Sequence, residues 1–114
     1  MITRDLVAII GGRVICGNDK IDREVAHAFA SDLMSDVLTL DKENILLITG
    51  LANMQTIRTA EMSDISCILF VRNKKVTDEM IDLAEENNMI LIQCASSMFK
   101  TVGELYVAGL KPVY

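Results

Sequence analysis

The sequence is poor in the residues that interrupt a folded chain. Among its 114 residues there is one proline, Pro112, and no segment rich in glycine and serine separates one part from another. Proline and glycine are the strongest sequence signals of a break between folded units. We therefore expect residues 1–114 to form a single domain, which is long enough to bury most of its apolar surface.

Aromatic residues and histidine are also scarce. Aromatic residues make up 4% of the chain and tryptophan is absent, although 51% of the residues are hydrophobic. The core must therefore consist mainly of aliphatic side chains and methionine, and a disordered chain is excluded. His27 is the only histidine, and Cys16, Cys67 and Cys94 lie far apart in apolar segments. This spacing favours buried structural thiols in a reducing compartment over a zinc site or a catalytic triad, and we predict no cofactor.

The chain has neither an excess of positive charge nor a long apolar run. Its net charge of −5 repels polyanions, so nucleic acid is not an expected partner. The longest uncharged apolar stretch, residues 65–71, is much shorter than the roughly 20 residues that span a bilayer. The first residues show no signal-peptide pattern. We expect a cytoplasmic protein that has no membrane partner.

What the chain does contain is a series of apolar segments with the properties of strands. Residues 44–49, 65–71 and 89–94 form continuous apolar runs, which are typical of parallel strands buried on both faces. Two further strands are predicted at 13–16 and at 24–30, the latter because Val25, His27 and Phe29 recur at every second position and so lie on one side.

Helices are predicted around these strands. The first has Thr3 as its N-cap and ends at Gly11-Gly12, and a second covers residues 32–40. Three more follow the apolar runs, with Asn53, Thr77, and Ser96 or Ser97 as the capping residues. Strands and helices that alternate in this way form right-handed crossovers. The predicted fold is an α/β three-layer sandwich, with a mainly parallel sheet of about four or five strands and helices on both faces.

Polar residues follow each buried strand and form the first candidate site. The carboxyl ends of parallel strands meet at one edge of the sheet, where helix N-termini offer N–H groups to anions. We therefore predict that a small anionic metabolite or a nucleotide binds there. The candidate residues are Thr49, Gly50, Asn53, Arg72, Asn73, Ser96 and Ser97. The alternative is that Gly50 relieves a tight turn while Asn53, Thr77 and Ser97 only cap helices.

The segment SDLMSDVL, residues 31–38, is the second candidate. If it is helical, Asp32 and Asp36 lie one above the other and could hold a cation weakly. Alternatively, Ser31 or Asp32 caps the helix, and Leu33, Met34, Val37 and Leu38 bury its inner face. The segment could also lie at a subunit interface to which Met34 adapts. The candidate residues are Ser31, Asp32, Met34, Ser35 and Asp36. No strong metal site is predicted from them.

Four segments, in this order and spacing, resemble the DRTGG domain family. They are SDLMSDVL, LLITGLANMQTIRTAEM, ILFVRNKKVTDEMIDLAEENNMILIQC and FKTVGELYVAGL. The similarity extends from about Val14 to Leu110. The family includes the domain N-terminal to the catalytic part of HPr kinase/phosphorylase, domains beside CBS domains in certain pyrophosphatases, and small stand-alone proteins. The resemblance implies a stand-alone regulatory or oligomerising module without catalytic activity of its own, which pairs as a homodimer.

Three functions are compatible with these observations. The first, which we favour, is a non-catalytic and homodimeric module that senses a small ligand. The second is a pure oligomerisation or docking domain for an enzyme or kinase partner. The third is an uncharacterised enzyme related to phosphoryl transfer, although no nucleophile–base pair is evident and the GxxxxGK[ST] phosphate-binding loop is absent.

Overall fold

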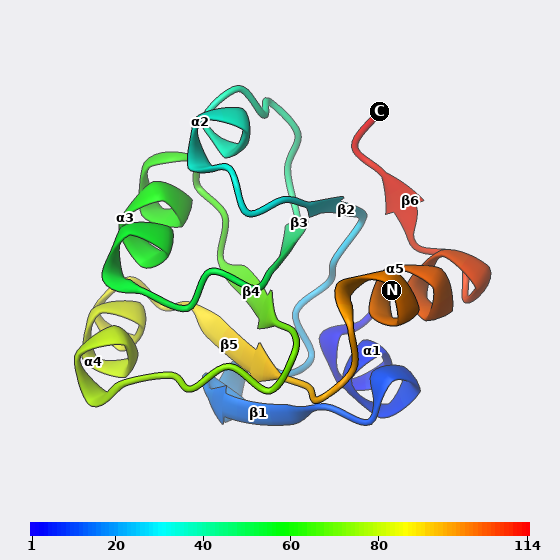
Figure 1. The fold of residues 1–114 in the computed structure, drawn as a ribbon, viewed down its shortest axis with the longest axis horizontal. Helices are drawn as coiled ribbons and strands as arrows, with labels where there is room; N and C mark the ends of the chain where they lie inside the picture. The colour runs from blue at the N-terminus through cyan, green and yellow to red at the C-terminus, as the bar shows by residue number, and fades with distance from the viewer.

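A six-stranded sheet forms the centre of the computed structural model, which describes all residues from 1 to 114 (Figure 1). The strands are β1 (Arg13–Cys16), β2 (His27–Ala30), β3 (Ile45–Thr49), β4 (Cys67–Phe70), β5 (Ile90–Gln93) and β6 (Lys111–Pro112). Their order across the sheet is β1-β5-β4-β3-β2-β6. Neighbouring strands are parallel except for β1, which is antiparallel to β5.

Helices cover both faces of this sheet. They are α1 (Thr3–Ile10), α2 (Met34–Val37), α3 (Met54–Met62), α4 (Asp78–Glu86) and α5 (Met98–Val107), with a short 3₁₀ helix, η1 (Asn18–Lys20). Helices α2, α3 and α4 lie on one face, and α1 and α5 lie on the other (Figure 1). The predicted three-layer α/β sandwich is therefore confirmed, with slightly more strands than expected. None of the helices is both long and apolar enough to cross a membrane.

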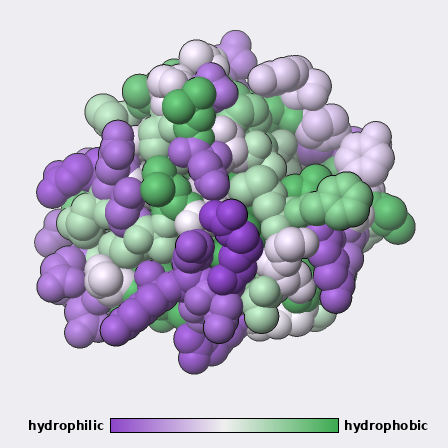
Figure 2. Space-filling model, in the orientation of Figure 1, coloured by the Kyte–Doolittle hydropathy of each residue, from purple (hydrophilic) through white to green (hydrophobic).

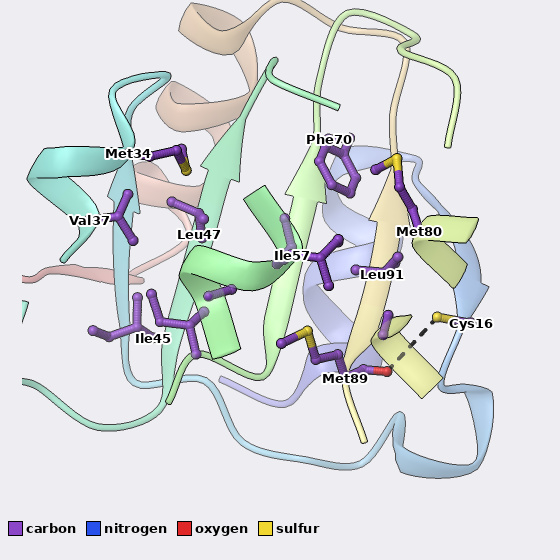
Figure 3. Close-up of a cluster of buried hydrophobic side chains, with 14 of the residues drawn as sticks. Cys16, Met34, Val37, Ile45, Leu47, Ile57, Phe70, Met80, Met89 and Leu91 are labelled. Atoms are coloured by element: carbon purple, nitrogen blue, oxygen red, sulfur yellow. Dashed lines mark hydrogen bonds between the residues drawn. The ribbon is translucent and has the colours of Figure 1, made fainter. Parts of the chain in front are cut away.

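The central strand β3 shows how the two faces are filled. All five of its residues are buried. Ile45 and Leu47 pack beneath α2, α3 and α4, whereas Leu46 and Ile48 pack beneath α1 and α5. In Figure 3, Met34, Val37, Ile57 and Met80 extend from the helices toward the strands of the first cluster. Full burial of an aliphatic side chain contributes about 1.5–3 kcal/mol to the free energy of folding. Burial on both faces therefore explains the unbroken apolar sequence of the strand.

The predicted helix caps are confirmed at three positions. The side chains of Asn53, Thr77 and Ser97 each accept a hydrogen bond from a backbone N–H in the first turn of α3, α4 and α5. At α1 the prediction is off by one residue, because Ile2 is the N-cap. Thr3 lies inside that helix, and its hydroxyl donates to the carbonyl of Arg23 at 2.6 Å.

Three predicted elements were wrong in length or number. The helix expected at 32–40 is the single turn α2, which begins after Leu33 and has no side-chain cap. The strand expected at 24–30 begins only at His27. The two-residue strand β6 was not predicted, because it contains Pro112, which lacks a backbone N–H. An edge strand tolerates this loss, since proline needs no partner on the open side.

The thiols and the histidine lie where the sequence suggested. Cys16, Cys67 and Cys94 are buried and form no disulfide. Burial raises the pKa of the Cys67 thiol to about 12, so this side chain stays protonated at neutral pH and behaves as a small apolar group. His27 is half-buried in β2.

Two glycines in different settings provide a test of the fold. Gly17 has φ +88°, and a Cβ added there would lie 2.8 Å from the carbonyl oxygen of Met89. We expect Gly17→Ala to lower the free energy of unfolding by about 1–3 kcal/mol because of backbone strain and this close approach. Gly103, inside α5, has open space around it. Gly103→Ala should therefore raise the free energy of unfolding by about 0.5–1 kcal/mol.

Urea denaturation of both variants and of the wild type measures these changes. Similar effects of the two substitutions would contradict the contact between the turn at Gly17 and the start of β5.

Candidate functional site

The carboxyl ends of β2, β3, β4 and β5 lie at one edge of the sheet, and the segments that follow them are joined by backbone hydrogen bonds. The N–H of Ser31 donates to the carbonyl of Ile48 at 3.0 Å. Beyond β4 and β5, the N–H of Arg72 donates to the carbonyl of Ser96 at 2.8 Å. These bonds fix the polar loops beside one another. In Figure 2, hydrophilic side chains gather over the region of the β4–α4 loop.

The carboxylate of Asp32 is the centre of the polar contacts at this edge. Its Oδ1 accepts a hydrogen bond from the Gly50 N–H at 2.7 Å and another from the Thr49 hydroxyl at 2.8 Å. Its Oδ2 lies 3.5 Å from Nη2 of Arg72. We call Asp32, Thr49, Gly50 and Arg72 the Asp32 cluster. Three chemically different donors thus converge on one negatively charged group.

These donors keep Asp32 ionised. The hydrogen bond from the Gly50 N–H lowers the pKa of the Asp32 carboxyl below its usual range, and partial burial opposes this effect. The Thr49 hydroxyl and the positive charges of Arg72 and Lys74 lower the pKa further. Hydrogen bonds and positive charges favour the charged form of a carboxyl group. The cluster therefore stabilises an anion at this position.

Gly50 makes room for the guanidinium of Arg72. A Cβ placed on Gly50 would lie 2.7 Å from Cζ of Arg72, which is closer than real Cβ atoms approach another group. The guanidinium therefore occupies the space that a side chain would take. A side chain at position 50 would displace this flexible, half-exposed guanidinium, whereas the backbone itself does not require glycine, because φ of Gly50 does not lie in the left-handed region.

The backbone of Arg72 is in an unfavourable conformation. Arg72 and Asn73 have φ values of +61° and +56°, and only asparagine of the two adopts this left-handed region readily. The Arg72 side chain is 49% exposed and makes one ion pair, and exposed pairs contribute only about 0–1 kcal/mol. Stability therefore does not account for an arginine here. Strained residues of this kind gather at binding sites.

The structure brings together part of the predicted ligand-binding set. Thr49, Gly50 and Arg72 are in direct contact through Asp32. The backbone of the neighbouring loops also participates, because Ser96 accepts from the Arg72 N–H and Asn73 donates its N–H to the carbonyl of Cys94.

Asn53 and Ser97 do not belong to this group. Their side-chain oxygens accept hydrogen bonds from Thr56 and Lys100 at the starts of α3 and α5. No hydrogen bond or ion pair joins them to the Asp32 cluster. Helix capping therefore accounts for the side-chain oxygens of both residues. Ligand binding by the whole predicted set stays a prediction.

The segment SDLMSDVL is organised differently from the predicted helix. Asp32 lies before α2, so the expected stacking of Asp32 on Asp36 along one helix face was wrong. Of the apolar residues expected on the inner face, Met34 and Val37 are buried in the chain's own core, whereas Leu33 and Leu38 are exposed. A place of this segment at an interface stays a prediction. The Ser31 hydroxyl accepts the N–H of Leu33 at 2.9 Å.

Ser35 and Asp36 remain exposed on α2. The donors around Asp32 suit an anion better than a cation, which would require several oxygen ligands. No group of three or more His, Cys, Asp or Glu side chains is arranged to hold a metal ion.

Two residues of this region were not placed correctly from the sequence. Asp32 was assigned to a different candidate site, although the position after a strand next to β3 was the signal that could have placed it beside Thr49. Gln93 was not considered at all. Its side chain accepts from Arg13 at 2.7 Å and donates to the carbonyl of Lys74 at 2.5 Å, which ties the β4–α4 loop to β1 and β5.

The fold and its polar edge define a small α/β sandwich, and comparison with known proteins gives its family. Residues 5–107 match the DRTGG domain, so the chain belongs to the DRTGG domain family. No curated protein sequence is significantly similar to it.

A solved structure shares the fold. It contains the CBS and DRTGG domains of the regulatory region of Clostridium perfringens pyrophosphatase, complexed with its activator diadenosine tetraphosphate. The TM-score is 0.73 at 14% sequence identity, and the match covers 96% of this chain but only 46% of that chain. The chain thus spans about half of the matched structure.

The lowered pKa of Asp32 predicts a specific pH dependence of stability. A carboxyl group whose pKa is lower in the folded state than in the unfolded state stabilises the fold above its unfolded pKa of about 3.9. This contribution is lost as the pH falls through the folded pKa. We therefore expect Asp32→Asn to reduce the free energy of unfolding at pH 7, and this deficit should shrink as the pH falls below about 4.

Urea denaturation at pH 7 and at pH 3 measures this difference. Asp36→Asn is the matched control, because it removes the same charge from an exposed position on α2. If the deficit of Asp32→Asn is the same at both pH values, the three donors do not stabilise the charged form of Asp32.

Proposed function

We propose that the chain is a non-catalytic regulatory module that binds a small phosphorylated ligand, such as a nucleotide, at the Asp32 cluster. In this proposal residues 1–114 act as one domain in the cytoplasm, which suits the three free and buried thiols. The observation that carries the proposal is the convergence of the Gly50 N–H, the Thr49 hydroxyl and the Arg72 guanidinium. Backbone N–H, hydroxyl and guanidinium groups are the donors with which proteins hold phosphate oxygens.

The family and the chemistry of Asp32 support a regulatory function. The similar pyrophosphatase structure is described as a regulatory region with a nucleotide activator, and we extend this class of ligand to the present chain. A carboxylate with a lowered pKa is a weak base near neutral pH, so Asp32 is poorly suited to catalyse phosphoryl transfer, and we favour binding without chemistry.

Ligand binding predicts thermal stabilisation that depends on Arg72. We expect one or more of ATP, ADP, diadenosine tetraphosphate and inorganic pyrophosphate to raise the melting temperature. A ligand at about 100 times its dissociation constant adds about 2.7 kcal/mol, which corresponds to a shift of roughly 10 °C or more in a small domain. Arg72→Asn should abolish this shift and leave the fold intact, because asparagine adopts the left-handed backbone conformation.

The matched control is Arg58→Gln, which removes an exposed arginine from the middle of α3. It should leave the shift unchanged. The proposal is wrong if no phosphorylated compound stabilises the wild type, or if Arg72→Asn responds as strongly as the wild type does.

We also propose that two copies of the chain pair through α5. The observation in favour is a set of exposed apolar side chains on α5: Phe99, Tyr106 and Val107. Figure 2 shows apolar side chains at the side of the molecule where α5 lies. An apolar groove adjoins them between α5, β2 and β6, lined by Ala28, Ala30, Val102, Tyr106 and Pro112 among others. A two-fold pair buries the same apolar patch on both copies.

Substitution on α5 tests this pairing. Val107 is 87% exposed, so Val107→Glu should leave the folded chain intact while a charge in the paired surface prevents association. Sedimentation velocity at micromolar concentration should show a dimer for the wild type and a monomer for the variant. Met62→Glu is the control, because Met62 is 67% exposed on α3, away from α5. A wild type that sediments as a monomer contradicts the pairing.

A further inference from the structure

The two donors that make the shortest hydrogen bonds in the Asp32 cluster are already occupied by Asp32 itself. The Gly50 N–H has one hydrogen, and it points to Oδ1 of Asp32 at 2.7 Å. The Thr49 hydroxyl has one hydrogen, and it is donated to the same oxygen at 2.8 Å. A phosphate oxygen cannot receive these hydrogens while Asp32 holds them. Only the guanidinium of Arg72, which has five N–H donors, retains capacity for a second anion.

Electrostatic repulsion leads to the same conclusion. The Asp32 carboxylate and a bound phosphate would both be negatively charged within the reach of the Arg72 guanidinium, and like charges at such distances repel each other. A phosphorylated ligand that uses the donors of Gly50 and Thr49 must therefore move the carboxylate away from them.

The segment that carries Asp32 can allow this movement without a change in the core. Asp32 lies in the loop between β2 and α2, and its side chain is already 47% exposed. The helix that follows is a single turn without a side-chain cap. Leu33, which precedes that helix, is itself exposed. Turning the Asp32 side chain into solvent would break the contacts of the cluster and would leave the buried clusters of the core unchanged.

We propose that the Asp32 carboxylate is an internal substitute for the ligand: it occupies the anion position at the Gly50 N–H and the Thr49 hydroxyl, and a phosphate group displaces it on binding. This inference rests on the proposed function and adds how the site is regulated. Asp32 competes with the ligand and so sets the concentration at which the module responds. Its displacement transmits binding to the β2–α2 loop.

The alternative for Asp32 makes the opposite prediction. If Asp32 instead serves to hold the Arg72 guanidinium in place for the ligand, removal of the carboxylate weakens binding. Competition predicts that removal strengthens it. The sign of the change in affinity therefore separates the two roles.

The test is isothermal titration of the full chain with inorganic pyrophosphate and with ATP. We expect Asp32→Ala to bind about 10-fold to 100-fold more tightly than the wild type, the range that corresponds to hydrogen bonds with a charged partner. The affinity of Asp32→Asn should lie between those of the wild type and Asp32→Ala, because the asparagine amide oxygen can still accept from the Gly50 N–H but carries no charge. Because two variants at position 32 are measured, the test remains valid if one of them does not fold.

Asp36→Ala is the matched control for net charge, since it removes a carboxylate from the same segment outside the cluster. An equal gain in affinity for Asp36→Ala and Asp32→Ala would overturn the inference, and so would unchanged or weaker binding by both Asp32 variants. In the wild type, the NMR resonances of the Gly50 amide and of residues 31–33 should shift together with ligand, and a static loop would contradict the displacement.

The outcomes also separate this inference from the proposed function. If the wild type binds pyrophosphate or ATP and Arg72→Asn does not, but Asp32→Ala gains nothing, only the displacement of Asp32 is wrong. If neither the wild type nor any Asp32 variant binds a phosphorylated compound, the proposed function and this inference are both wrong.

Discussion

Burial of the central strands on both faces is the constraint on which the rest of the structure depends. Strands β3 and β4 are fully buried, so their side chains cannot carry polar function without the cost of burying it. Polar groups must therefore collect where the strands end. Because β2 to β5 run parallel, their carboxyl ends lie at one edge, and the loops that follow them come together there. The Asp32 cluster is a consequence of this arrangement.

Within the cluster, small groups make the close contacts possible. Gly50 contributes an N–H to Asp32 and leaves space for the guanidinium of Arg72. Arg72 in turn adopts a left-handed backbone that hydrogen bonds to the β5–α5 loop maintain. The chain thus keeps a cation, an N–H and a hydroxyl around one negative charge, and this combination links the fold to the class of ligand we propose. The structure that contains CBS and DRTGG domains shares the fold at only 14% identity, and buried layers of this kind can be filled by many aliphatic sequences.

Much of the fold could be predicted because its signals are local. Continuous apolar runs indicated the three central strands, and Asn53, Thr77 and Ser97 marked the starts of three helices within one turn of the chain. The weak elements were predicted least well. Helix α2 is a single turn that its packing stabilises, and β6 has only two residues, so neither leaves a periodic pattern. The side of the sheet to which α5 returns, and hence the place of β6 beside β2, depends on the assembled core.

The sequence by itself determined the α/β class, the buried thiols, the helix caps and the polar character of the strand ends. Each of these properties depends on the type of a residue and on its near neighbours along the chain. Only the tertiary structure decided that Asp32 lies against Thr49 and Gly50, which are 17 and 18 positions away in sequence. These contacts depend on which strands lie side by side, and strand order results from the packing of the whole sheet against its two layers of helices.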